Sequence, residues 1–187
     1  MQSGTIPFTR LFDYIKRHKE IPHKDDPAFG GFKDLYLQLC RQIADIPGWY
    51  AWVRFTNGAS SIVYVGQSQT RKTASLKARL TEEFLDEYVA LWATVWDPEE
   101  VVNTLDRKYR GKYTIPIKRS ARKAGSTHIV WCGKLGLSDH ELDVVEHRLI
   151  DKYSPPANKQ SRSHSDSFLD LLTAADTALQ AEIAKLG

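Results

Sequence analysis

Five polar side chains between residues 50 and 158 are of the types that cleave a phosphodiester bond. They comprise two phenols, one guanidinium, one carboxylate and one amide, carried by Tyr50, Tyr64, Arg79, Glu146 and Asn158. Hydrolysis of a phosphodiester needs an activated water molecule, neutralisation of charge around the phosphorus and help for the leaving oxygen. These residue types suit that reaction when one divalent metal ion assists them.

Glu146 is the expected metal ligand, because a carboxylate oxygen suits a hard divalent ion that retains most of its water molecules. It adjoins Leu142, Val145 and Leu149 on an apolar helical stripe, and this position predicts burial near a sheet. The competing interpretation is a solvated helix glutamate, which is the usual place of this residue type.

Arg79 is expected to bind the phosphate through its planar, permanently charged guanidinium group. The alternative is a surface arginine beside Lys77. Asn158 is expected to hydrogen-bond the phosphate or the backbone of the site, against the alternative of an ordinary turn asparagine. It follows Glu146 by twelve residues and comes after Pro155-Pro156, which ends the preceding helix.

Tyr50 is predicted to be the general base, with Tyr64 positioning water or phosphate. A free phenol has a pKa of about 10 and is a poor base at neutral pH. Arg79 and the metal ion are therefore expected to lower the pKa of the base. The other interpretation is that both tyrosines only pack within strands, where this residue type is common.

The hydrophobic pattern indicates which elements carry these residues. Residues 50–55 and 61–65 are rich in aromatic and β-branched side chains and flank Asn57-Gly58, a pair typical of a tight β-hairpin turn. A helix carrying Arg79 is predicted over 75–86.

The second half of the chain supplies a further strand and two further helices. A third strand is predicted over 127–132, and Ser138 and Glu141 form a capping box that starts the helix of Glu146. Leucines and alanines at helical spacing predict an amphipathic helix at the C-terminal end.

The whole chain, 1–187, is expected to be a single domain, since its length is enough for one core. Residues 1–47 are predicted to form a helical N-terminal extension, 48–158 the core with an insertion near 87–126, and 159–187 a C-terminal amphipathic helix. The predicted fold class is α/β, of the α+β type: a small three-stranded antiparallel sheet flanked by helices, with helical additions at both ends.

Charge is segregated in the middle of the chain, although the net charge is only +3. Eight acidic residues and no Lys or Arg lie between residues 80 and 106, and eight basic residues without Asp or Glu follow in 107–125. We expect the basic run to contact DNA phosphates, against the alternative of a solvated loop that balances the acidic segment. The residues assigned to DNA binding are Lys112, Lys118, Arg119, Arg122, Lys123 and Arg162.

The two cysteines, Cys40 and Cys132, are far apart in the sequence and have no histidine at metal-ligand spacing. This pattern argues against a zinc site or a disulfide framework and favours a reducing compartment. The first residues lack a signal-peptide pattern and no apolar run is long enough to span a membrane. The expected location is therefore the cytoplasm, without a membrane partner.

The motifs as an ordered set resemble the signature of the GIY-YIG nuclease superfamily over residues 48–158. They are Gly48-Trp49-Tyr50, Tyr64-Val65-Gly66, Arg79, Glu146 and Asn158. The resemblance implies a small antiparallel sheet flanked by helices, cleavage of double-stranded DNA, and one Mg²⁺ per active site, with Mn²⁺ as a substitute. It implies that the five polar residues are catalytic.

Several positions depart from the pattern of that superfamily. Trp49 and Val65 each replace an isoleucine, which a buried strand tolerates, and residues 70–74 form an insertion before the arginine helix. Gln67 stands where relatives often have lysine, and Glu83 stands where histidine or tyrosine is frequent. The last two departures bear on auxiliary roles and leave the five polar residues intact.

Within the superfamily, the pattern favours a sequence-specific type II restriction enzyme, because the chain is compact and has no separate C-terminal DNA-binding domain. Palindromic sites are commonly cut by two-fold dimers, so a homodimer is the expected assembly. The alternatives are a structure-specific repair or recombination nuclease and a non-catalytic DNA-binding module on the same fold.

Overall fold

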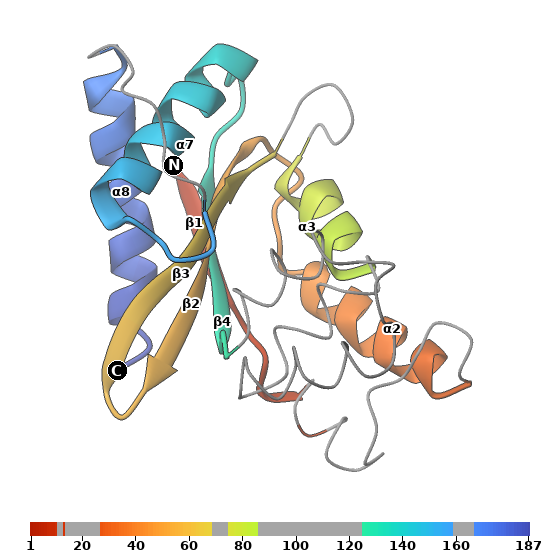
Figure 1. The fold of residues 1–187 in the computed structure, drawn as a ribbon. Helices are drawn as coiled ribbons and strands as arrows, with labels where there is room; N and C mark the ends of the chain where they lie inside the picture. The colour runs from red at the N-terminus through yellow and green to blue at the C-terminus, as the bar shows by residue number, and fades with distance from the viewer. Residues whose placement is uncertain (11–12, 14–26, 69–74, 86–124, 159–166) are drawn as a thin grey trace, which may run out of the picture.

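A four-stranded antiparallel sheet separates two pairs of helices (Figure 1). The computed structural model describes residues 1–10, 13, 27–68, 75–85, 125–158 and 167–187. The strands, in the spatial order β1-β4-β2-β3, are β1 (Gln2–Pro7), β4 (His128–Gly133), β2 (Gly48–Thr56) and β3 (Ala59–Gln67). The helices are α2 (Pro27–Cys40), α3 (Leu76–Leu85), α7 (Asp139–Tyr153) and α8 (Leu169–Ala184). Helices α7 and α8 cover one face, and α2 and α3 lie on the other.

The sheet has one strand more than the three predicted, and the additional strand lies within the N-terminal extension predicted to be helical. β1 pairs with β4 from Gln2 opposite Gly133 to Pro7 opposite His128. Its pattern in the sequence is weak, because Ile6 is its only buried residue. Pairing with a partner more than a hundred residues away, rather than a local hydrophobic period, therefore makes this segment a strand.

The locally encoded elements form as predicted. Asn57 and Gly58 have φ of 53° and 76° and join β2 to β3, the left-handed conformation that a tight hairpin turn requires. At the start of α7 the Ser138 side chain accepts from the Glu141 N–H, while the Ser138 N–H donates to the Glu141 carboxylate at 2.8 Å. The helix ends at Tyr153, just before Pro155, because a proline cannot continue the ladder of helical hydrogen bonds.

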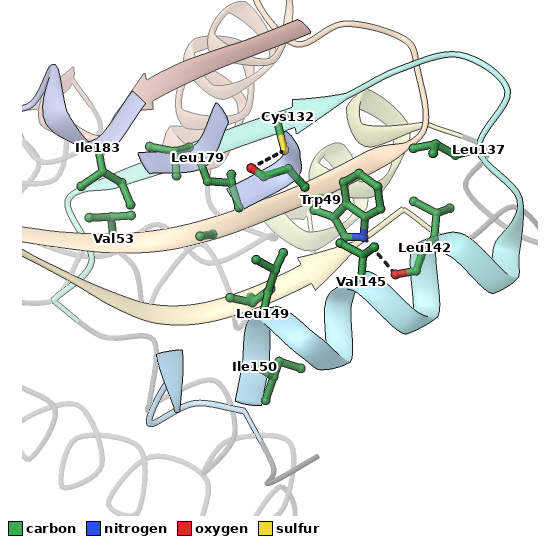
Figure 2. Packing of buried hydrophobic residues seen from close by; sticks show 14 residues of the cluster. Trp49, Val53, Cys132, Leu137, Leu142, Val145, Leu149, Ile150, Leu179 and Ile183 are labelled. Carbon is green, nitrogen blue, oxygen red and sulfur yellow. Dashed lines mark hydrogen bonds between the residues drawn. The ribbon is translucent and has the colours of Figure 1, made fainter. Parts of the chain in front are cut away.

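β2 lies inside the sheet and is buried on both faces. Trp49, Ala51 and Val53 point toward α7 and α8, whereas Tyr50 and Trp52 point toward α2 and α3. Figure 2 shows the first of these two cores, where Trp49 Nε1 donates to the backbone oxygen of Leu142 at 2.9 Å. This strand therefore joins both layers of the protein.

The predicted insertion near 87–126 lies almost entirely outside the described residues. None of the described helices has the length and apolar character to cross a membrane.

A buried carboxylate ties the C-terminal helix to the N-terminal strand. Glu182 of α8 is 5% exposed and accepts from Ser3 Oγ at 2.8 Å, Thr5 Oγ1 at 3.1 Å and Lys185 Nζ at 2.6 Å. Burial by itself opposes ionisation of this carboxyl, but the hydrogen bonds outweigh it and hold its pKa below the usual value.

Replacement Glu182→Ala is expected to lower the free energy of unfolding at pH 7 by about 1–3 kcal/mol, because the hydroxyls of Ser3 and Thr5 lose their charged acceptor. The folded-state pKa is depressed, so this stability is present above the unfolded-state pKa and is lost as the pH falls. Urea unfolding at several pH values measures the difference between the two proteins. Exposed Asp170 on the same helix supplies the control, Asp170→Ala, and a pH-independent difference would contradict the assignment.

Candidate active site

A bulge in β3 puts the two tyrosines on the same face of the sheet. Trp52 pairs with Tyr64 and Val53 pairs with Ile62, so that Val63 is an additional residue in β3. Val63 and Tyr64 consequently both pack toward the core on the α2 and α3 side.

The ring of Tyr50 lies across Gly66, its partner on β3. A Cβ atom at Gly66 would lie 2.5 Å from Cζ and Oη of Tyr50, so only glycine leaves room for the phenol. The rings of Tyr50 and Tyr64 are 6.2 Å apart between centroids. In the motif Tyr64-Val65-Gly66, the glycine therefore matters because it has no side chain, in addition to the contribution of its tyrosine.

Glu83 brings Tyr50 and Arg79 together. The Tyr50 hydroxyl donates to Glu83 Oε1 at 2.6 Å, Arg79 Nη2 donates to the same oxygen at 3.0 Å, and Arg79 Nε donates to Tyr50 Oη at 3.4 Å. The second carboxylate oxygen accepts from Trp52 Nε1 at 3.3 Å. Glu83 and Arg79 are one turn apart on α3, and this helical spacing makes the pair possible.

Both phenols have a raised pKa, so neither ionises readily in the surroundings that the protein provides. Burial raises the pKa of Tyr50 well above its usual value; Glu83 and Tyr64 raise it further, and Arg79 opposes the shift. Burial also raises the pKa of Tyr64, together with the negative charges of Glu83 and Glu146, while Arg79 and a hydrogen bond with Tyr50 lower it. The expected effect of Arg79 is present, but burial is the larger influence.

Glu146 lies on α7, where the helix passes the end of β3. Its Oε2 accepts from Gln67 Nε2 at 3.0 Å, and that same amide nitrogen lies 3.5 Å from Oδ1 of exposed Asp143. Burial raises the pKa of Glu146 to about 7, although His147, Gln67 and Arg79 act in the opposite direction. The carboxylate is therefore held in place by an amide that brings no charge.

Asn158 holds the outer edge of β3. Its Oδ1 accepts from the Val65 N–H and its Nδ2 donates to the Val65 carbonyl, both at 2.8 Å, while the Ala157 N–H donates to the Val63 carbonyl at 3.0 Å. The side chain thus imitates a neighbouring strand at an edge that would otherwise have unpaired backbone groups. Asn158 reaches the backbone beside Tyr64, one of the two roles expected for it.

The described residues bring the five expected side chains to one end and edge of β3. Two residues outside the expected set join them: Glu83 contacts Tyr50 and Arg79, and Gln67 contacts Glu146. In the sequence the available signal for Glu83 is its position four residues after Arg79 on the same helix. The six residues assigned to DNA binding, Lys112, Lys118, Arg119, Arg122, Lys123 and Arg162, lie outside the described residues.

The donor set around Glu146 fits a cation that needs few protein ligands. Among the residues that the structure describes, no three His, Cys, Asp or Glu side chains form a group able to hold a metal ion. A single carboxylate is sufficient for Mg²⁺, which keeps several of its own water molecules. The raised pKa of Glu146 indicates that its negative charge is poorly compensated by the protein, as expected for a ligand of an external cation.

Comparisons with protein-family models, with curated proteins and with solved structures found no match for this chain. The resemblance to the GIY-YIG superfamily therefore rests on the motif residues of the sequence.

Replacement Asn158→Asp is expected to lower the free energy of unfolding at neutral pH by about 1–3 kcal/mol, because the Val65 carbonyl loses its donor and faces a carboxylate oxygen. Lowering the pH should reduce the deficit, since protonation of the new carboxyl restores a donor. Urea unfolding at pH 7 and pH 4 measures both effects. The control Asn57→Asp changes an exposed turn asparagine in the same way, and equal losses in both variants would contradict the edge-holding role.

Replacement Glu146→Gln is expected to raise the free energy of unfolding at pH 8 by about 1–3 kcal/mol, because ionised Glu146 is disfavoured in the fold. The folded-state pKa is raised to about 7, so the favourable contribution of this carboxyl is complete below its unfolded pKa and is lost as the pH rises through about 7. The gain from the substitution should accordingly shrink between pH 8 and pH 4 in urea unfolding. Exposed Asp151 on the same helix provides the control Asp151→Asn; a Glu146→Gln protein no more stable than wild type at pH 8 would count against the burial of this charge.

Proposed function

We propose that this protein is a Mg²⁺-dependent endonuclease that hydrolyses phosphodiester bonds in double-stranded DNA, with an active site of the GIY-YIG type. The observation that carries the proposal is the cluster of Tyr50, Tyr64 and Arg79 beside β3, with Glu146 bound to Gln67 at the end of the same strand. These side chains come from two strands and two helices on opposite faces of the sheet. Core packing alone has no need for a guanidinium, a carboxylate and two phenols at one point.

Arg79 is suited to bind the scissile phosphate. Its side chain is 33% exposed, and its Nε and Nη2 atoms are occupied by Tyr50 and Glu83. Within the described residues its Nη1 has no hydrogen-bond partner and remains available to a phosphate oxygen. An arginine fixed on two of its nitrogens meets an incoming phosphate with little loss of side-chain entropy.

Glu146 would hold the metal ion, with Gln67 fixing its carboxylate. A bound Mg²⁺ supplies charge neutralisation around the phosphorus and its oxygens. Arg79 adds a second positive charge from α3. The two charges together would offset the charge that builds up on the phosphate during attack by water.

Between the two phenols, the burial pattern favours Tyr64 as the one that meets water. The side chain of Tyr50 is fully buried, whereas Tyr64 is partly exposed. This assignment reverses the order expected from the sequence, in which Tyr50 was the general base. Tyr50 then contributes indirectly, through the more exposed Tyr64.

The finer proposal is a sequence-specific type II restriction enzyme acting as a homodimer, with the basic run in 107–125 on DNA phosphates. Its support is the segregated charge in the sequence. A structure-specific nuclease and a non-catalytic DNA-binding module are the competing functions. DNA substrates distinguish the three directly.

Purified protein with Mg²⁺ is expected to cut duplex plasmid DNA into discrete bands, and EDTA should abolish cutting. The Glu146→Ala and Arg79→Lys variants should each lose at least about 100-fold in rate, because each removes charge stabilisation that operates in the transition state. Gel assays of plasmid, branched and flapped DNA measure the activity. DNA binding in EDTA should persist in the Glu146→Ala variant.

The matched control is Asp151→Ala, which removes an exposed carboxylate from the same helix as Glu146 and should cut at the wild-type rate. Preferential cutting of branched or flapped DNA would favour the structure-specific nuclease. Binding by the wild-type protein without cleavage of any of these DNAs would reject the enzyme and favour the non-catalytic module.

A further inference from the structure

Glu83 is a buried carboxylate that the proposed function has not yet used. It is 6% exposed and lies between α3 and the central strand β2. Its two oxygens accept from Tyr50 Oη at 2.6 Å, Arg79 Nη2 at 3.0 Å and Trp52 Nε1 at 3.3 Å. A buried carboxylate is costly unless such donors compensate it.

A line of hydroxyls connects this carboxylate with the partly exposed side of the site. Tyr50 donates its only proton to Glu83, so its oxygen acts as an acceptor toward its other neighbours. The ring of Tyr64 neighbours that of Tyr50, with 6.2 Å between the ring centroids, and Tyr64 is the more exposed of the two phenols. The path from solvent therefore runs through Tyr64 and Tyr50 to Glu83.

We propose that Glu83 is the final proton acceptor of the reaction, reached from the attacking water through Tyr64 and Tyr50. This inference rests on the proposed endonuclease function. Glu83 acts through Tyr50 and does not touch the substrate, so it is a positioning residue and not a catalytic one. Its place four residues after Arg79 lets one carboxylate orient the phosphate-binding guanidinium and receive the proton.

The proton transfers balance along this path. One O–H bond of water breaks as its oxygen forms a bond to phosphorus, and that proton passes to Tyr64 Oη. Tyr64 passes its own proton to Tyr50 Oη, and Tyr50 passes its proton to Glu83 Oε1. The bond from phosphorus to the leaving oxygen breaks, the leaving oxygen takes a proton from solvent, and Glu83 returns its proton to solvent after release of the product.

Such a path avoids a free phenolate, which the surroundings of both tyrosines disfavour. The donor-to-acceptor distance of 2.6 Å between Tyr50 and Glu83 is within the range for proton transfer. Among the described residues, the charged and titratable groups facing Glu83 include Arg79 on its own helix, Tyr50 on β2, Tyr64 on β3 and Tyr36 on α2. Arg79 is the only cation among these groups, and it remains charged at all working pH values.

The decisive variant is Glu83→Gln, which keeps the shape and one acceptor oxygen but removes the charge and the second acceptor, which faces Trp52 Nε1. Its single-turnover rate with Mg²⁺ should fall about 100-fold or more, the usual contribution of a general base, while DNA binding in EDTA stays close to wild type and circular dichroism shows the variant folded at the assay temperature. The residual rate should rise about tenfold per pH unit over the alkaline range where the wild type is level, because water must then lose its proton to hydroxide. Glu82→Gln, an exposed neighbour on α3, is the control and should retain the wild-type rate and pH profile.

A second measurement does not depend on cleavage. The proton of Tyr50 shared with Glu83 should give a downfield, slowly exchanging hydroxyl signal in proton NMR. This signal should be missing from the Tyr50→Phe protein and shifted upfield in the Glu83→Gln protein. Absence of such a signal from the wild type overturns the proposal whatever the cleavage assay gives.

The cleavage results test the role of Glu83 separately from the endonuclease function. A Glu83→Gln protein that cuts within about threefold of wild type, or that keeps the wild-type pH profile at a reduced rate, overturns the role of Glu83 and leaves the endonuclease proposal standing. A wild-type protein that cuts no DNA removes both proposals.

Discussion

Burial of β2 on both faces is the constraint on which the site depends. Trp49 and Ala51 are locked into one core, and Tyr50 and Trp52 into the other. Because side chains alternate along a strand, slipping the register by one residue would move Tyr50 to the α7 side of the sheet. The apolar neighbours of Tyr50 thus hold its hydroxyl against α3, where Glu83 and Arg79 are found.

The two carboxylates of the site differ in how their charge is compensated. Glu83 has a guanidinium, a phenol and an indole as donors, so its charge is neutralised within the protein. Glu146 has one amide donor, Gln67, and its pKa is raised to about 7. An external cation would therefore stabilise Glu146 more than Glu83, and this difference supports the proposal that Glu146 holds the metal ion.

Elements specified by nearby residues were predicted well. The hairpin turn at Asn57-Gly58 and the capping box of Ser138 and Glu141 depend on a few neighbouring positions, so their chemistry is visible in the sequence. β1 was predicted wrongly, as part of a helical extension, because its stability comes from backbone pairing with β4 far along the chain. The additional residue at Val63 gave no signal either, since a bulge is defined only against the partner strand.

The order of the residues was sufficient to select Tyr50, Tyr64, Arg79, Glu146 and Asn158, because their types and intervals are properties of the chain itself. Only the folded arrangement decided that Gly66 makes room for the Tyr50 ring, that Asn158 completes the edge of β3, and that Glu83 receives the hydrogen bond of Tyr50. The physical reason is that burial, close approach and hydrogen-bond direction depend on atoms brought in from distant segments. These properties arise only when the two pairs of helices pack against the two faces of β2.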